Sequence, residues 1–308
     1  MSLRTAIIGI GGIAHKGYLP ILAAWEGIEL VLCSRNTTVL KSTQAQYRIA
    51  HSTTSLDVLC DWRPDVAFVL TPADTHRTIV EKLLRAGIDV FVEKPATQSS
   101  LETHQLAEIA DELGRVLMVA FNRRYAPLHR QAKELWGNQP IQLALFEKHR
   151  SSASHPNLYQ NFIEDTVHII DLLRFFCGEV EVISTVEQAQ NGLLVGAAST
   201  TRLSEGGFGI VLTSLQAGGW REHYTLHGSS SSLYIDAFNR LVFIDRDGEH
   251  TWQETYASTW QTTLKARGFF DQIAHFLDCV QTRQVPQTSA WDALKTQLLL
   301  EAIVACAT

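Results

Sequence analysis

The sequence has few cysteines, and their spacing suggests neither a disulfide framework nor a metal site. The five cysteines are odd in number and far apart: Cys33, Cys60, Cys177, Cys279 and Cys306. No two of them form a Cys-x-x-Cys pair, and none is spaced from a histidine as in a zinc finger. We therefore expect reduced thiols, no metal ion and a cytoplasmic location.

Long hydrophobic runs are also missing. No apolar stretch approaches the roughly 18 to 20 residues that cross a bilayer, so we expect no membrane partner. Arg4 and the small apolar residues after it resemble the core of a signal peptide, but the ordered spacing of three glycines argues against that reading. Positive charge is scarce as well, because 26 Lys and Arg face 32 Asp and Glu, a net charge of -6. Without a basic block to neutralise a phosphate backbone, we expect no nucleic-acid partner.

The chain is long and apolar enough to fold around a sizeable core. Its 308 residues are 45% hydrophobic and 19% charged, which excludes a disordered protein and fits about two domains. Over the first 121 residues, expected strands at 4–10, 28–33, 65–71, 88–92 and 115–121 alternate with expected helices at about 13–25, 37–47, 56–59, 75–86 and 100–113. This alternation predicts a doubly wound α/β domain with a parallel sheet.

From residue 122 the pattern changes. Helices are expected at about 124–136 and 164–177, a strand at 141–149, six further strands between 180 and 245, and closing helices at 267–282 and 289–306. Alternation of apolar and polar residues in these strands predicts an antiparallel sheet with one solvated face. We expect a Rossmann domain at 1–121 and an α+β domain at 122–308, and we also weigh a return of the final helix onto the first domain.

A glycine-rich turn follows the first expected strand. Residues 9–14 read GIGGIA and fit the dinucleotide-binding pattern G-x-G-x-x-A between a strand and a helix. Gly9 permits a tight turn, Gly11 lets the backbone approach a pyrophosphate, and Ala14 lets the helix pack closely on the sheet. Together with Gly12 and Ile13, these three residues form the expected phosphate-binding loop. The alternative is a turn that needs glycine only for its backbone angles.

The second expected strand lacks the carboxylate that commonly binds the ribose hydroxyls of NAD. After Cys33 the chain continues with Ser34 and Arg35. A hydroxyl and a guanidinium suit the 2'-phosphate of NADP through charge-assisted hydrogen bonds. The sequence therefore predicts NADP as the preferred cofactor, with NAD as the second choice, unless Arg35 is only a solvated loop charge.

A Glu-Lys-Pro tripeptide follows the strand at 88–92, where open α/β sheets bind their ligands. Together with GIGGIA, TPADTH (71–76), FNRRY (121–125) and EDTVHIIDLLRFFCG (164–178), the segment EKPAT (93–97) resembles the glucose-fructose oxidoreductase/inositol dehydrogenase/MocA (Gfo/Idh/MocA) family. The resemblance covers the whole chain. It implies an N-terminal Rossmann domain, a C-terminal domain with an open antiparallel sheet that mediates oligomerisation, and oxidation or reduction of a carbinol with NAD or NADP.

The resemblance also implies roles for individual residues. Thr71, Pro72 and His76 match the segment beside the nicotinamide, and Glu93 and Asn122 belong to the matching motifs, so we expect all five to contact the cofactor. Lys94 matches the lysine that contacts substrate and cofactor, and His168 matches the histidine that acts as acid or base. The family commonly has Asp four residues before this histidine. Here Glu164 holds that place with Asp165 next to it, and either carboxylate could share the histidine's helix face.

Two other readings stay open. His168 could be a core histidine on an apolar helix, and the protein could be a catalytically silent NAD(P)-binding regulator or sensor, which would need neither Lys94 nor His168. A methyltransferase is disfavoured by the second domain. We expect an NAD(P)-dependent dehydrogenase or reductase that acts on CH–OH groups of a sugar, inositol or similar polyol. It should form a homodimer or homotetramer through the outer face of its second sheet.

Overall fold

The computed structural model describes residues 2–151, 155–253 and 263–308. The chain forms two compact units, the first made of Met1–Ala120 with Phe269–Leu294 and the second of Phe121–Gly268 with Lys295–Thr308. Residues 269–294 therefore group with the first unit. The sequence analysis assigned 122–308 to the second domain and weighed a return of only the final helix, 289–306, onto the first. The helix pattern of residues 269–294 gives no information about which sheet they cover.

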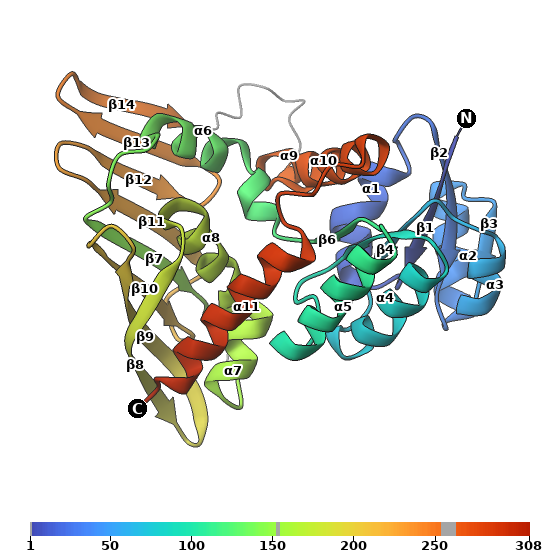
Figure 1. Cartoon of the computed structure of the whole chain (residues 1–308), viewed down its shortest axis with the longest axis horizontal. Coiled ribbons are helices and arrows are strands. Elements are labelled where there is room, and N and C mark those ends of the chain that lie inside the picture. The colour runs from blue at the N-terminus through green and yellow to red at the C-terminus, as the bar shows by residue number, and fades with distance from the viewer. Residues whose placement is uncertain (1, 152–154, 254–262) are drawn as a thin grey trace. The chain divides into compact units, whose positions relative to one another are not determined.

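The first unit contains a six-stranded parallel sheet in the order β3-β2-β1-β4-β5-β6 (Figure 1). Its strands are β1 (Leu3–Ile8), β2 (Ile28–Cys33), β3 (His51–Thr53), β4 (Val66–Val69), β5 (Asp89–Val92) and β6 (Leu117–Val119). The strand order reverses between β1 and β4, which is where ligands bind in such sheets. The expected doubly wound fold is confirmed, although β3, a short and polar strand, was not predicted.

Helices flank this sheet, and several begin at side-chain caps. They are η1 (Ala14–Tyr18), α1 (Leu19–Leu22), α2 (Thr37–Tyr47), α3 (Leu56–Asp61), η2 (Ala73–Thr75), α4 (His76–Arg85), α5 (Ser100–Glu112), α10 (Phe269–Thr282) and α11 (Ala290–Ala305), which begins in this unit. Asn36, Ser55 and Ser99 accept hydrogen bonds from the first backbone N–H groups of α2, α3 and α5. The expected helix at 13–25 is a π-helical turn followed by one short α-helix.

The second unit contains an eight-stranded sheet in the order β14-β13-β12-β11-β7-β10-β9-β8 (Figure 1). Its strands are β7 (Leu143–His149), β8 (Val180–Gln190), β9 (Leu193–Leu203), β10 (Phe208–Ser214), β11 (Arg221–His227), β12 (Ser232–Asp236), β13 (Arg240–Asp245) and β14 (Gly248–Gln253). All neighbours are antiparallel except β7 and β10. The expected, mostly antiparallel sheet is confirmed, with β14 as an additional strand.

One face of the second sheet is covered by helices. The helical segments of this unit are η3 (Asn122–Tyr125), α6 (Pro127–Trp136), α7 (Leu158–Asn161), η4 (Phe162–Thr166), α8 (Val167–Cys177) and α9 (Thr263–Ala266). Helix α8 packs on β7 and β10, and α6 packs on β12 and β13. Residues of β7 and β11 are therefore buried alternately, including Phe146 and Tyr224. The other face exposes apolar side chains such as Phe208 and Tyr234.

Candidate active site

A cavity of about 1030 Å³ lies at the carboxyl end of the first sheet. Among the residues that line it are six of the predicted cofactor-binding residues: Gly9, Gly11, Ser34, Arg35, Thr71 and Pro72. They follow β1, β2 and β4, so the sheet topology alone gathers them from three distant stretches of sequence. The cavity lies at the reversal of strand order, where a dinucleotide is expected to bind.

The glycines of the turn after β1 serve two different needs. Gly9 has φ +90°, and a Cβ atom there would lie 2.7 Å from Thr71 Cγ2 and 2.8 Å from the backbone of Leu70. Gly9 is thus required by the protein itself. A Cβ on Gly11 would meet no protein atom within 4 Å and would instead enter the open space beside the cavity lining. This arrangement fits the close approach of a pyrophosphate to the backbone.

The remaining residues of the predicted phosphate loop differ in burial. Gly12 and Ile13 are exposed, whereas Ala14 is completely buried against the first unit. A small side chain at position 14 lets the start of the helix lie close to the sheet, as the motif requires. The sequence interpretation of each position is compatible with the geometry, and the loop can hold the phosphates of a dinucleotide.

Arg35 stands exposed at the cavity rim, after the end of β2. Within the described part of the chain it makes no ion pair. Ser34 accepts a weak hydrogen bond from the backbone N–H of Asn36 at 3.3 Å. No carboxylate follows β2 at positions 34–37, so the lining that follows β2 carries a cation and a hydroxyl.

His76 is buried between two loops rather than lining the cavity. Its Nε2 lies 2.8 Å from the carbonyl oxygen of Thr71, and its Nδ1 lies 2.8 Å from that of Pro95. Burial lowers the pKa of His76, although the two carbonyl groups oppose this effect. The imidazole thus fastens the loop after β4 to the loop that carries Lys94, and it positions both.

The Glu-Lys-Pro loop is fixed by two residues that sequence reasoning missed. The buried hydroxyl of Tyr18 donates a hydrogen bond of 2.5 Å to Glu93 Oε1, and Gln272 Nε2 donates to the same hydroxyl at 3.4 Å. The other Glu93 oxygen accepts the backbone N–H of Lys94 at 3.1 Å. Glu93 is therefore committed to holding the loop, and Lys94, half-buried, precedes a cis bond to Pro95.

In the second unit, Glu164 and Asp165 lie in the π-helical turn η4, directly before the helix that carries His168. The Asp165 carboxylate accepts hydrogen bonds from both Nε, at 3.0 Å, and Nη2 of Arg150, and lies 2.8 Å from Lys148 Nζ. Glu164 is 64% exposed and lies 3.8 Å from His155. The two carboxylates thus have different surroundings, and Asp165 is the one held by cations.

Lys148 belongs to a buried ionic cluster that the sequence analysis did not predict. Arg123 donates two hydrogen bonds to Glu222, with Nε to Oε2 at 2.8 Å and Nη2 to Oε1 at 2.5 Å, and Tyr224 donates a third. Lys148 Nζ lies 3.6 Å from Glu222 Oε1. Burial would raise the pKa of Glu222, but Arg123, Lys148 and Tyr224 together hold that pKa at about 2. The sequence did contain one signal: Lys148 occupies a position of β7 at which the alternation of the strand predicts a buried side chain.

Asn122 is used within the second unit. Its side-chain amide donates a hydrogen bond of 2.8 Å to the backbone carbonyl of Arg267. Lys94 and the cofactor cavity belong to the first unit, whereas Asn122, Asp165 and His168 belong to the second.

In the described residues, no group of His, Cys, Asp and Glu side chains could hold a metal ion. Among the helices described, none is long and apolar enough to cross a membrane.

Comparisons with known proteins agree with this geometry. Residues 3–121 match the model of the Gfo/Idh/MocA family, described as an oxidoreductase family with an NAD-binding Rossmann fold. The oxidoreductase YceM of Salmonella typhimurium is 28% identical over 98% of this chain and 97% of its own. D-apiose dehydrogenase of Paraburkholderia graminis is 26% identical over 97% of this chain and 86% of its own.

A solved structure extends the match to both units. The structure of a Gfo/Idh/MocA family oxidoreductase from Vibrio cholerae has a TM-score of 0.87 and 27% identity, and the match covers 99% of this chain and 97% of that one. The resemblance inferred from EKPAT and the other motifs is thereby confirmed. Residues 3–121 thus match the NAD-binding Rossmann domain of the Gfo/Idh/MocA oxidoreductase family, and the chain as a whole is similar in sequence and in fold to Gfo/Idh/MocA oxidoreductases.

Proposed function

We propose that this enzyme transfers a hydride between the nicotinamide of NADP(H) and a carbinol or carbonyl carbon of a sugar, inositol or related polyol. The observation that carries this proposal is the cavity lined by Gly9, Gly11 and Arg35, followed on the next strand by the fixed Glu93–Lys94 loop. The name of the relative D-apiose dehydrogenase supports a sugar as substrate.

The chemistry requires a group that exchanges a proton with the substrate oxygen. The nicotinamide accepts or supplies the hydride, so the hydroxyl must lose its proton when the carbinol is oxidised. His168 is our proposed acid–base residue, because imidazole exchanges protons near neutral pH. Lys94 is proposed to orient the oxygen and stabilise the negative charge that develops on it. In the reductive direction the same groups act in reverse.

We propose NADP(H) as the preferred cofactor. Arg35 is exposed at the ribose end of the cavity with no acidic neighbour at positions 34–37, so it can bind a 2'-phosphate through charge-assisted hydrogen bonds. A carboxylate in its place would repel that phosphate. NAD(H) is therefore expected to bind without the contribution of Arg35.

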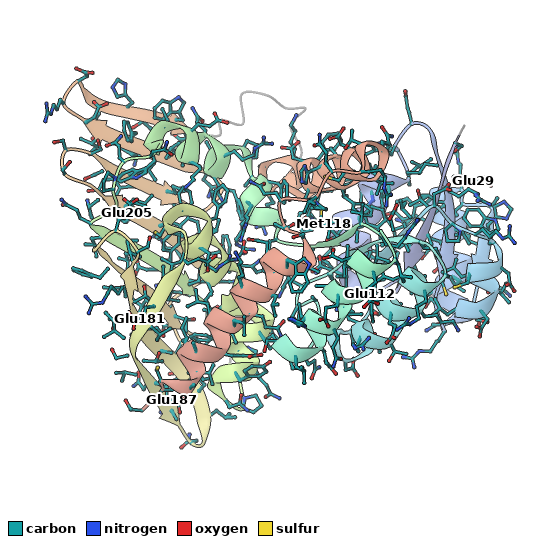
Figure 2. All side chains as sticks on the ribbon, viewed as in Figure 1. Glu29, Glu112, Met118, Glu181, Glu187 and Glu205 are labelled. Carbon is teal, nitrogen blue, oxygen red and sulfur yellow. The ribbon has the colours of Figure 1, made fainter. Side chains whose placement is uncertain are left out.

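We also propose a cytoplasmic homo-oligomer. The uncovered face of the second sheet exposes Phe208, Tyr234 and their neighbours, and such apolar patches commonly bind another protein surface. The edge strand β8 carries Glu181 and Glu187 (Figure 2), and charges on an edge strand oppose edge-to-edge pairing. Association is therefore proposed to use the sheet face rather than this edge.

Turnover on a panel of sugars, inositols and their keto forms, with NAD(H) and NADP(H), tests the proposal. We expect the enzyme to oxidise or reduce at least one panel member, as measured by the absorbance of the reduced nicotinamide. This change in absorbance should be lost in Lys94→Ala. A protein that binds the dinucleotide but turns over no panel member would favour the alternative, a catalytically silent NAD(P)-binding regulator.

A further inference from the structure

In the part of the second unit that the structure describes, one arginine forms no ion pair with an acidic side chain. The guanidinium of Arg267 is half-buried, with its central carbon 5.4 Å from the ring centre of Trp220 and 5.2 Å from that of Phe238. Across residues 2–151, 155–253 and 263–308, no carboxylate lies within ion-pair distance of it. The ring contacts hold the guanidinium without supplying a negative charge.

The carboxylates of the neighbouring ionic cluster are already engaged. Glu222 is bound by Arg123 and Tyr224, and Asp165 is bound by Arg150 and Lys148. The cluster then contains two carboxylates and four cationic side chains: Glu222 and Asp165, and Arg123, Lys148, Arg150 and Arg267. If all six groups are ionised, the cluster carries an excess of two positive charges. Burial lowers the pKa of Arg267, and the like charges of Arg123 and Arg150 add to that effect, while Glu222 opposes it in part.

The backbone of Arg267 is fixed in place. Its carbonyl oxygen accepts the hydrogen bond from Asn122, and the next residue, Gly268, has φ +79°. A Cβ atom on Gly268 would lie 2.2 Å from the carbonyl oxygen of Asn122. The turn after α9 is thus pressed against the Asn122–Arg123 turn, so Arg267 emerges at a defined point beside the cluster.

A partly buried excess of positive charge is costly unless an anion compensates it. Stacking on aromatic rings uses the flat face of a guanidinium and leaves its N–H edge available, and that edge matches a carboxylate or phosphate in a two-point hydrogen bond. Arg150, whose side chain is 40% exposed, adds a second accessible cation.

We propose that Arg267 is a specificity-determining residue that binds a carboxylate or phosphate group carried by the substrate, with Arg150 reinforcing the attraction. This inference rests on the proposed function, because it assigns a substrate class to the second unit of an enzyme that acts on CH–OH groups. The substrate is then an acidic sugar, a sugar phosphate or a hydroxy acid rather than a neutral polyol.

Three matched probes separate the neutral and charged classes: D-glucose, D-glucuronate for the carboxylate and D-glucose 6-phosphate for the phosphate. Their binding to the NADP⁺-saturated protein is measured by calorimetry, and their oxidation by nicotinamide absorbance. Arg267→Gln removes the charge. Arg267→Lys keeps the charge but loses the planar guanidinium that forms a two-point hydrogen bond. The matched control is Arg130→Gln, which removes an exposed arginine from α6. Circular dichroism and melting curves establish that each variant is folded.

We expect wild type to bind at least one charged probe about 10- to 100-fold more tightly than D-glucose, as hydrogen bonds to charged groups imply. Arg267→Gln should abolish this preference, Arg267→Lys should keep part of it, and Arg130→Gln should keep all of it. Equal binding of neutral and charged probes by wild type, no binding of any probe, or an unchanged preference in Arg267→Gln would overturn the proposal.

The two readouts separate the two levels of inference. A charge preference that depends on Arg267, without oxidation of any probe or panel member, leaves the anion site standing and rejects the proposed reaction. Turnover of neutral sugars with no effect of charge or of Arg267→Gln keeps the proposed reaction and rejects the anion site.

Discussion

The ammonium group of Lys148 lies 2.6 Å from the backbone carbonyl oxygen of Asp165 and 2.8 Å from one oxygen of its carboxylate. Lys148 belongs to β7, and Asp165 belongs to the turn three residues before His168. The contact therefore ties the second sheet to the turn that begins the histidine helix. One buried side chain positions an element that the proposed chemistry needs.

We expect Lys148 to make the free energy of unfolding increase with pH in the alkaline range. Burial, with a contribution from Arg123, lowers its pKa from 10.5 to about 7. Between these values the unfolded chain binds more protons than the folded one, so the free energy of unfolding should rise with pH, by up to about 1.4 kcal/mol per unit. Urea unfolding of wild type and Lys148→Met at pH 7 to 10 tests this. Equal slopes in the two proteins would contradict it, and Lys41→Met, at an exposed position, is the control.

Asp165 and Glu164 should respond differently to loss of charge. Asp165→Asn removes a carboxylate from buried Lys148 and should cost about 3 to 5 kcal/mol of stability. Glu164→Gln, at a position that is 64% exposed, should leave stability nearly unchanged. If Glu164 nevertheless supplies the family carboxylate, its variant should lower turnover and shift the pH profile. Denaturant unfolding and kcat against pH, measured on both variants, distinguish the roles.

Arg35→Ala should weaken NADP(H) binding by about 10- to 100-fold and leave NAD(H) affinity nearly unchanged, because only NADP(H) carries the 2'-phosphate. Fluorescence titration of both cofactors measures the effect. Arg63→Ala removes another arginine of the first unit, which lies outside the cavity lining, and should change neither affinity. Tighter binding of NAD(H) than NADP(H) by wild type would show that the assignment is wrong.

Lys94→Ala and His168→Ala should each reduce kcat by about 100- to 10,000-fold, the usual contribution of acid–base groups. Cofactor affinity should change far less, because both groups are proposed to act on the substrate oxygen. Single-turnover kinetics and cofactor titration on the same preparations separate the two effects. Activity of His168→Ala within a few-fold of wild type would leave proton transfer to Lys94 or to another group.

Sedimentation at micromolar concentration should show a dimer or larger assembly. Phe208→Asp introduces a charge at a side chain that is 52% exposed on the uncovered sheet face, and it should shift the equilibrium toward monomer. Val285→Asp is the matched control, since this residue is 80% exposed and belongs to the first unit. A monomeric wild type would refute the proposed association.

The grouping of Gly9, Gly11, Ser34 and Arg35 around one cavity was predictable because the information is local. Gly9 and Gly11 stand in one short motif after a strand, and the end of β2 is read directly as Ser34 and Arg35. The order of strands in a doubly wound sheet then brings these segments to one cavity. Tyr18 escaped prediction because its partner Glu93 is 75 residues away in the chain.

The ionic cluster was not predictable for a related reason. Arg123 and Glu222 are separated by 99 residues, and only the pairing of β7 with β11 brings Lys148 opposite Glu222. The local sequence around each of these residues gives no information about which residue it pairs with. The strands β3 and β14 were missed because their residues, HST and GEHTWQ, are polar and short and give no clear alternation.

Arg35 and Gly9 line the same cavity, yet they differ in how freely they can vary. Arg35 is exposed and forms no ion pair in the described chain, so its replacement should alter the proposed cofactor preference and cost the fold little. Gly9 has no such freedom, because any side chain would strike Leu70 and Thr71. If Arg35 has the proposed role, substitutions at the cavity rim would change the preference between NADP(H) and NAD(H) without any change in the glycine turn that is proposed to hold the phosphates.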